Sequence, residues 1–444
     1  MLRSIVATFC VLGLSVSLLM AGEGRDKNQK VGTGDWPQFR GLNGTGIATD
    51  AKPPLKWTEK DGVKWKTPLP GPGSSSPIVL GDRIFVTCYS GYGVEKAGTG
   101  TVEKLKRHLV CLDRTTGKVR WTADVVAVTP EDSYRGFITE HGYASSTPAT
   151  DGEAVYVFFG KSGVLAFDLD GKKLWQTSAG KESDIRRWGS SASPILYENL
   201  VIVNAASESR SVVAFDKKTG KQAWKAEGKR LSLSFSTPAL VKATDGRIDL
   251  VVAMPSEVWG LDPETGKRRW QTAIDPNGNI CPGVVASDGV AYVTGGYGTK
   301  GSLAVKVGGS GDVSKTNLLW SIGKSSYVPT PVLHAGRLFN VNEDGIAVCF
   351  KADKGEVVYE KRLSVKAPGG RGSRPFYASP VLADGRLYAV SRKAGVFVLA
   401  AGDTFEQLAV NPPLDESDFN ASPAVVGRQI FLRSNKFLYC LEAR

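Results

Sequence analysis

The 444-residue chain is poor in the side chains that most metal and redox sites use. It has three histidines (His108, His141 and His334), and its six cysteines include no adjacent pair and no Cys-x-x-Cys spacing. A histidine-rich metal centre is therefore excluded. The five cysteines that follow Cys10 are an odd number, which argues against a complete set of disulfides. We predict no metal site and no catalytic cysteine.

Long segments with the 3.6-residue apolar period of a helix are also absent after the N-terminus. Abundant Val, Gly and Ser, together with ten tryptophans, favour β structure instead. The formal net charge is +12, but many lysines occupy turn positions and read as solvated hairpin tips. A nucleic-acid partner is therefore not predicted.

The N-terminus has the layout of a secretory signal peptide. Arg3 precedes an apolar run from Ile5 to Met20, which is short for a membrane span, and small and then charged residues follow. We expect a signal peptide over residues 1–21, a flexible tether over residues 22–34, and a secreted or periplasmic location in the cell envelope. Leu19 is large for the position two residues before the cleavage residue Ala21, so an uncleaved anchor is the alternative. No other transmembrane span is predicted.

Two repeated patterns predict the fold. The first joins an Asp, a Gly-Lys turn and a Trp: "CLDRTTGKVRW" (111–121), "AFDLDGKKLW" (166–175), "AFDKKTGKQAW" (214–224) and "GLDPETGKRRW" (260–270). The second places prolines, most of them after Ser or Thr, at 77, 148, 194, 238, 282, 331, 380 and 423. Apart from one interval of 71 residues, these prolines lie 43 to 49 residues apart, which is the period of four-stranded propeller blades. We predict a single all-β domain over residues 35–444, an eight-bladed β-propeller of four-stranded antiparallel blades.

The last repeat holds only three strands, and "DGVKWKTP" (61–68) near the N-terminus matches the outer-strand pattern. Residues 62–67 are therefore expected to complete blade eight and close the ring, which removes an exposed sheet edge. The tryptophans of the pattern are expected to pack between neighbouring blades, with each indole N–H reaching backbone. These docking tryptophans are Trp65, Trp121, Trp175, Trp224, Trp270 and Trp320.

The repeated motif resembles the tryptophan-docking repeat of quinoprotein-type propellers, and "DWPQFRGLNGTG" (35–46) resembles the entry segment of secreted members of this PQQ-like superfamily. The resemblance covers roughly residues 35–444 and implies two kinds of function. Dehydrogenases of the superfamily imply PQQ, an adjacent Cys-Cys pair, a Trp under the cofactor, a Ca²⁺ site with carboxylate and amide ligands, and an Asp base. Scaffolds similar to BamB, the propeller subunit of outer-membrane barrel assembly, imply none of these.

The longer loops are expected on one face of the ring, where they surround the mouth of the central channel. Arginines and aromatic residues gather in them, which suits carboxylates, anionic sugars or a protein interface. The candidate binding residues are Arg186, Arg187, Trp188, Arg374, Phe376, Tyr377, Asn420, Tyr143 and Tyr327. In the alternative interpretation, Trp188, Phe376 and Phe419 plug the funnel, and the arginines pair with Asp184 or Asp418.

The sequence therefore favours an exported, non-catalytic binding or scaffold propeller, with an envelope protein or an anionic envelope polymer as partner and no cofactor. The alternative is a divergent PQQ-dependent oxidoreductase that acts on alcohols or sugars with PQQ and Ca²⁺. A carbohydrate-active, lyase-type propeller is a third hypothesis.

Overall fold

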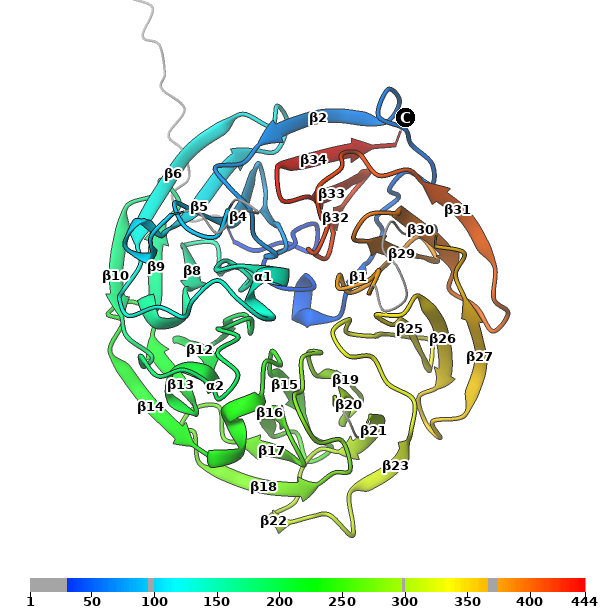
Figure 1. The fold of residues 1–444 in the computed structure, drawn as a ribbon. Helices are drawn as coiled ribbons and strands as arrows, with labels where there is room; N and C mark the ends of the chain where they lie inside the picture. The colour runs from blue at the N-terminus through cyan, green and yellow to red at the C-terminus, as the bar shows by residue number, and fades with distance from the viewer. Residues whose placement is uncertain (1–29, 95–99, 298–299, 366–373, 444) are drawn as a thin grey trace, which may run out of the picture.

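The computed structural model describes residues 30–94, 100–297, 300–365 and 374–443. Eight antiparallel sheets surround a central axis (Figure 1), each with four strands of its own blade, and two of them carry one further short strand. The prediction of an all-β, eight-bladed propeller is confirmed. The expected signal peptide, residues 1–21, lies outside the described residues, as does most of the expected tether over residues 22–34.

The first four blades follow the chain order, from the inner to the outer strand. Blade 1 holds β3 (Ile78–Leu80), β4 (Arg83–Ser90), β5 (Lys106–Asp113) and β6 (Val119–Val126). Blade 2 holds β7 (Ala149–Thr150), β8 (Ala154–Phe158), β9 (Val164–Asp168) and β10 (Lys173–Thr177). Blade 3 holds β11 (Ile195–Tyr197), β12 (Leu200–Ala205), β13 (Ser211–Asp216) and β14 (Gln222–Glu227). Blade 4 holds β15 (Ala239–Lys242), β16 (Ile248–Met254), β17 (Glu257–Leu261) and β18 (Arg268–Ala273), with β22 (Gly311–Asp312) added outside.

The other four blades complete the ring. Blade 5 holds β19 (Val285–Ser287), β20 (Val290–Gly295), β21 (Gly301–Lys306) and β23 (Leu318–Ile322). Blade 6 holds β24 (Val332–His334), β25 (Arg337–Val341), β26 (Ile346–Lys351) and β27 (Val357–Arg362). Blade 7 holds β28 (Val381–Ala383), β29 (Arg386–Ser391), β30 (Gly395–Ala400) and β31 (Gln407–Asn411). Blade 8 holds β32 (Ala424–Val426), β33 (Gln429–Arg433) and β34 (Phe437–Glu442), and its outer strand is β2 (Val63–Pro68).

Helical segments in the described part of the chain are short and lie in loops. They are η1 (Leu42–Gly44), η2 (Val102–Lys104), α1 (Ile138–His141), η3 (Gly160–Ser162), α2 (Ala206–Ser209) and η4 (Lys229–Leu233). Within the described ranges, no helix has the length and apolar character needed to cross a membrane.

The ring closes through the N-terminal part of the chain, as predicted. The antiparallel pairing of β2 with β34 places Trp65 opposite Cys440, and the closing strand runs one residue further along the chain than the expected 62–67. A second tie was not predicted: β1 (Ile47–Ala48) pairs in parallel with β28 at the inner edge of blade 7. The N-terminal segment therefore links blades 7 and 8.

Five docking tryptophans share one arrangement. The ring of Trp175, for example, lies over Gly220 in the turn of the next blade, where a Cβ atom would come within 2.6 Å of the indole. Trp175 Nε1 donates to the carbonyl oxygen of Lys217 at 2.8 Å. The same indole-to-carbonyl bond to the following blade is made by Trp65, Trp121, Trp224 and Trp320. Each glycine of the turn therefore provides the space that the neighbouring ring fills.

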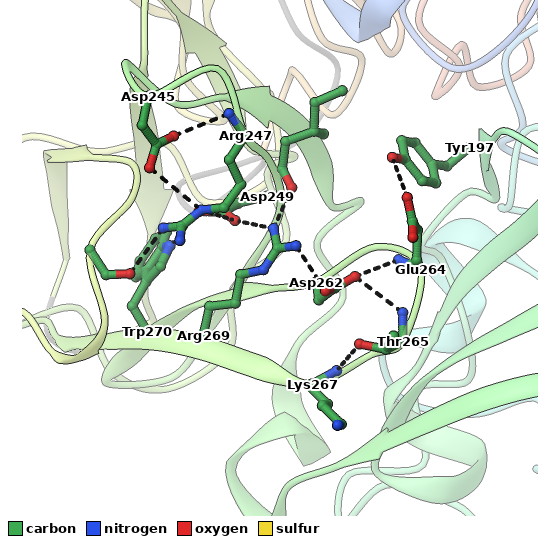
Figure 2. Close-up of polar contacts among 12 residues, drawn as sticks. Tyr197, Asp245, Arg247, Asp249, Asp262, Glu264, Thr265, Lys267, Arg269 and Trp270 are labelled. Carbon is green, nitrogen blue, oxygen red and sulfur yellow. Dashed lines mark hydrogen bonds and ion pairs between the residues drawn. The ribbon is translucent and has the colours of Figure 1, made fainter.

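Trp270 departs from this arrangement. Its ring packs in the core between blades 4 and 5, but its Nε1 donates to the buried carboxylate of Asp249 at 2.7 Å instead of to the next blade (Figure 2). Arg269 also binds Asp249 at 2.7 Å. A Cβ atom on Gly260, in the same blade, would collide with the Trp270 ring. Blade 5 has "SKTNLLW" in place of the Asp and Gly-Lys turn, so Trp270 finds its acceptor in its own blade.

Candidate functional site

A cavity of about 130 Å³ is lined by residues at the start of all eight blades and therefore lies at the centre of the ring. Among the hydroxyl groups that line it, seven belong to residues that each precede a proline at the start of a blade: Ser76, Thr147, Ser193, Thr237, Thr330, Ser379 and Ser422. Cys281 lines the cavity at the eighth such position. The repeated Ser/Thr-Pro column of the sequence therefore becomes a belt around the axis.

These hydroxyls also connect the blades. Thr147 Oγ1 accepts the N–H of Ser76 at 2.9 Å, and Ser193 Oγ accepts the N–H of Thr147 at 3.0 Å. The same bond recurs from blade 3 to blade 4, from blade 6 to blade 7 and from blade 7 to blade 8. At blade 5, where Cys281 replaces the hydroxyl, Gly283 N donates to Thr330 instead, at 2.9 Å. The main role of the belt is therefore structural: its hydrogen bonds hold neighbouring blades together.

One end of the cavity is closed by the N-terminal segment. Phe39 lines the cavity, and the neighbouring Arg40 is buried and donates to the carbonyl oxygens of Thr330, Pro331 and Pro380 at 2.7 to 3.3 Å. Burial lowers the pKa of Arg40 to about 9. Carbonyl oxygens from blades 6 and 7 thus hold a buried cation beneath the cavity.

The other end is closed by an aromatic cluster centred on Phe137, the residue before α1. The Phe137 ring lies 4.8 Å from Trp188 and 5.9 Å from both Tyr327 and Tyr377, measured between ring centroids. These partners come from the loops that lead into blades 3, 6 and 7. In Figure 1, α1 points from blade 2 towards the centre of the ring. One loop therefore crosses the mouth of the channel and plugs it with a phenyl ring.

Arg392, in the β29–β30 hairpin, fastens α1 from the opposite side of the ring. Its Nη1 lies 2.7 Å from the Glu140 carboxylate, and its Nη2 lies 2.9 Å from that of Asp418. Arg392 Nε donates to Asn420 Oδ1 at 3.0 Å, and Asn420 Nδ2 donates to the carbonyl oxygen of Glu140 at 2.8 Å. The guanidinium also stacks on Tyr377 at 4.7 Å. We call Arg392 and Asn420 the outer latch.

The loop before blade 3 presents basic and apolar side chains at the rim. The buried Asp184 carboxylate accepts the N–H groups of Arg186 and Trp188 at 2.8 and 3.1 Å, which fixes the turn. Arg187 has a positive φ of 56°, an unfavourable conformation for a residue with a side chain. Ile185 is 81% exposed, and the Arg186 guanidinium stacks on Trp188 at 5.0 Å.

A second arginine stack lies on the blade 5–6 side of the mouth. The Arg374 guanidinium is 4.7 Å from the Tyr327 ring and 5.6 Å from the Tyr297 ring. Among the residues that the structure describes, no carboxylate lies within 4 Å of the guanidiniums of Arg186, Arg187 or Arg374. Their charges are therefore available to an anionic group.

Two of the titratable groups that line the cavity, His141 and Cys281, are held neutral. Burial lowers the pKa of His141 to about 4, and His141 Nδ1 lies 2.6 Å from Ser145 Oγ. Burial raises the pKa of the Cys281 thiol to about 12. Cys281 is therefore a poor nucleophile at neutral pH, because thiolate is the reactive form.

The sequence-predicted site residues separate into three groups. Trp188, Tyr377 and Asn420 line the central cavity, while Arg186, Arg187, Arg374 and Tyr327 lie at its mouth. Phe376 is fully buried against Phe397 in the core between blades 6 and 7. Tyr143 is buried in a separate cluster, where its hydroxyl donates to the carbonyl oxygen of Asp132 at 2.7 Å. The expectation that Phe376 and Tyr143 ring the mouth therefore needs correction, because both side chains turn into the core.

Sequence reasoning did not select Phe137, His141, Phe235 or Arg392, although the first three line the cavity and Arg392 fastens α1. Phe137, His141 and Arg392 lie outside the repeated columns, whereas Phe235 lies three residues before Pro238, the place that Tyr377 and Asn420 hold before their own prolines. The alternative interpretation also holds in part: Trp188 belongs to the plug and Asp418 binds an arginine, but that arginine is Arg392. Phe419 is buried against Tyr439 and does not enter the channel.

A family model described as "Outer membrane protein assembly factor BamB" matches residues 88–227 and 186–361, which together span more than half of the 444 residues. The chain belongs to this BamB-like family of PQQ-type propellers. No curated protein sequence matches it.

Solved structures agree with the family in fold. BamB from Moraxella catarrhalis is 12% identical, with a TM-score of 0.58, and the match covers 86% of this chain and 97% of that one. A europium-containing methanol dehydrogenase is also 12% identical, with a TM-score of 0.63 and coverage of 93% and 98%. The computationally designed Ika8 protein matches at 12% identity with a TM-score of 0.55, and the match covers 85% of this chain and 98% of that one. At this identity the similarity concerns the fold alone.

The lining of the central cavity of this BamB-like chain does not fit PQQ with Ca²⁺. No Asp, Glu, Arg or Lys of the described residues lines it, and the amide of Asn420 is already engaged by Arg392 and Glu140. Ca²⁺ requires six to eight oxygen ligands, usually with carboxylates among them. Nor does the described part of the chain contain a group of three or more His, Cys, Asp or Glu side chains suited to a metal ion. No quinone-dependent step can be assigned to these residues.

Proposed function

We propose that the protein is a non-catalytic binding propeller that docks a partner on the loop-rich face around the channel mouth. The observation that supports this function is the composition of the mouth. Phe137, Trp188 and Tyr377 fill it with half-buried rings, and Arg186 and Arg374 stack at its rim. Rigid aromatic rings and arginines dominate the energetics of protein interfaces.

The partner is an envelope protein or an anionic envelope polymer. Both can offer anionic groups to Arg186, Arg187 and Arg374, whose guanidiniums have no carboxylate within 4 Å in the described part of the chain. The Asp184 turn holds Ile185 and Arg186 in place before binding, so little conformational entropy is lost when the partner arrives. The protein acts as a scaffold that presents this fixed surface.

Location in the periplasm or cell envelope is part of the same proposal. It is supported by the basic residue and apolar run of residues 3–20 and by membership of the BamB-like family. Fractionation of cells that express the full chain, followed by mass determination of the N-terminus, tests both the location and the expected cleavage after Ala21.

The double variant Arg187→Ala with Arg374→Ala tests the docking surface. We expect it to lower capture of the partner from an envelope extract at least tenfold. The free energy of unfolding should change by less than about 1 kcal/mol, because Arg187 is exposed and Arg374 is half-buried at the rim, outside the blade cores. The matched control is Arg268→Ala with Arg337→Ala. Arg268 also stacks on an indole, that of Trp259, and Arg337 pairs with Asp403, but both lie on strands and not at the mouth.

Equal capture by the two double variants would contradict the proposed surface. Oxidation of alcohols or sugars by the purified protein, in the presence of one bound PQQ and Ca²⁺ per chain, would replace the scaffold function with that of an oxidoreductase.

A further inference from the structure

A second cavity lies next to α1. Its volume is about 20 Å³, enough for one water molecule. Ile138 at the start of α1 and Gly142 just after its end line this cavity, whereas His141 lines the central one. Ser145 lines both. The α1 segment therefore separates the two cavities.

We call this second space the charged cavity because two basic and three acidic side chains line it, all of them buried. They are Arg107 on β5, Glu131 and Asp132 before α1, Lys161 on η3 and Glu208 on α2. Buried charges are stable only when they are paired and hydrogen-bonded. The pairing in this cavity therefore determines how firmly the surrounding segments are held.

Both ends of the segment that carries Phe137 and α1 are fastened here. Before α1, Glu131 pairs with Arg107 at 2.6 Å, and Asp132 lies 3.3 Å from Lys161. After α1, the carbonyl oxygen of Tyr143 accepts a hydrogen bond from Arg107 Nε at 2.9 Å. We call Arg107 and Lys161 the inner latch.

Glu208 forms no ion pair with Arg107 or Lys161, which pair with Glu131 and Asp132. It is 1% exposed, and one of its carboxylate oxygens accepts a hydrogen bond from Ser190. Its other oxygen, Oε2, has no hydrogen-bond partner within the described residues, and neither has Asp132 Oδ2. These two carboxylate oxygens without hydrogen-bond partners line a cavity that holds about one water molecule. Burial of this kind disfavours the ionised form, so it favours a protonated state for one of the two acids.

The charge balance gives the same result. Arg107 and Lys161 neutralise Glu131 and Asp132, so the cavity is neutral only while Glu208 is protonated. Burial, followed by repulsion from Glu131, raises the pKa of Glu208 to about 7. Loss of this proton leaves a net negative charge beside the two acids that fasten the α1 segment.

Within the described ranges, the other segments around Glu208 place no compensating cation against it. The loop before β11 contributes the buried Asp184, which binds Ser207 Oγ at 3.1 Å. The η4 segment, which packs on α2, contributes Lys229 and Arg230, but both are exposed and Arg230 pairs with Glu257 at 3.1 Å. In the loop between β10 and β11, Glu182 pairs with Arg210 at 2.7 Å, so this arginine is also engaged elsewhere.

We propose that the α1 segment is a gate over the central cavity, closed while Glu208 is protonated and released when Glu208 ionises. Ionised Glu208 repels Glu131 and Asp132 and competes with Asp132 for Lys161, so the inner latch weakens. Water can then enter the charged cavity, α1 shifts, and Phe137 leaves the aromatic cluster. The outer latch on Glu140 remains, which makes the release partial.

The protein contains its own reporter of the gate. Cys281 lines the central cavity, whereas Cys88, Cys111, Cys349 and Cys440 are fully buried in the blade cores. The rate at which N-ethylmaleimide modifies Cys281, followed by peptide mass mapping, measures access to the cavity. Thiolate formation raises this rate with pH in every variant, so the ratio of wild type to variant at each pH isolates the gate.

The decisive comparison is wild type with Glu208→Gln, which is neutral at every pH and keeps the side-chain shape. We expect similar rates at pH 6 and at least a threefold faster rate for wild type at pH 8, where Glu208 is mostly ionised. Arg392→Ala breaks the outer latch and should increase the rate at both pH values. Arg337→Ala, which removes an ion pair on blade 6, should change neither.

A wild-type to Glu208→Gln ratio that is the same at pH 6 and pH 8 would overturn the proton-controlled gate. A rate that Arg392→Ala leaves unchanged would show that α1 does not control access. Neither outcome depends on whether a partner docks on the mouth, so the gate and the proposed function are tested separately.

Discussion

At the scale of single residues, Glu208 predicts an unusual pH dependence of stability. The folded state holds its proton up to a pKa of about 7, whereas the unfolded chain releases it near 4.5. The folded state therefore binds more protons between these values, and this contribution to the free energy of unfolding falls as pH rises, by about 3 kcal/mol in total. Above pH 7 both states are ionised and the contribution stays constant.

Urea unfolding of wild type and Glu208→Gln from pH 5 to 8 measures this effect. The free energy of unfolding of the variant should increase relative to that of wild type up to about pH 7. Above that pH the difference between the two should stay constant. The comparison is necessary because His141 acts in the opposite direction: its pKa is lowered to about 4, so its contribution increases with pH up to about 6.5. A constant difference from pH 5 to 8 would mean that Glu208 ionises normally.

At the scale of the elements, docking between blades depends on the turn glycines, which leave room for the tryptophan ring of the neighbouring blade. Gly220 has a φ of 68°, and a Cβ atom there would lie 2.6 Å from the Trp175 ring. Gly336 has a similar φ of 71°, but no atom lies within 4 Å of its Cβ position. Gly336→Ala should cost about 1 kcal/mol, for the backbone alone. Gly220→Ala should cost at least about 2 kcal/mol more, because the indole must move.

Chemical denaturation of the two variants provides the measurement, and fluorescence of the displaced tryptophan provides a second readout. Equal losses of stability would mean that the ring and the turn adjust freely, and that docking does not depend on the missing side chain.

The elements also explain which features the sequence could predict. Trp175 and Thr147 belong to sets of equivalent residues that are spaced at the blade period. Residues repeated in this way make the same contact in each blade, so the sequence could predict them. Phe137 and Arg392 occur once, in loops without a period, and only the path of the chain across the mouth brings them together. Phe376 and Tyr143 lie in such loops too, and their composition suggested exposure. Whether these two side chains point outward or inward depends on the core pockets that surround them. Those pockets are formed by residues distant in the sequence, so no local sequence pattern indicates the direction.

At the scale of the whole molecule, the pairing of β2 with β34 determines whether the ring is closed. Trp65 on β2 is buried against blades 8 and 1, and its Nε1 donates to the carbonyl oxygen of Arg114 in blade 1 at 3.0 Å. Replacement of residues 63–68 by a Gly/Ser segment of equal length keeps the N-terminal segment but removes this strand. We expect a loss of more than about 3 kcal/mol, the typical cost of removing one buried Trp.

The position of the damage distinguishes closure from a general loss of packing. Without β2, the edge of β34 loses its hydrogen-bond partners, so amide exchange should accelerate first in β32, β33 and β34, and soluble oligomers should form through the open edge. Replacement of β22, a strand added outside blade 4 that closes nothing, should leave exchange in blade 8 unchanged. Uniform acceleration around all eight blades would show that the ring opens as one cooperative unit, with β2 acting on the stability of every blade.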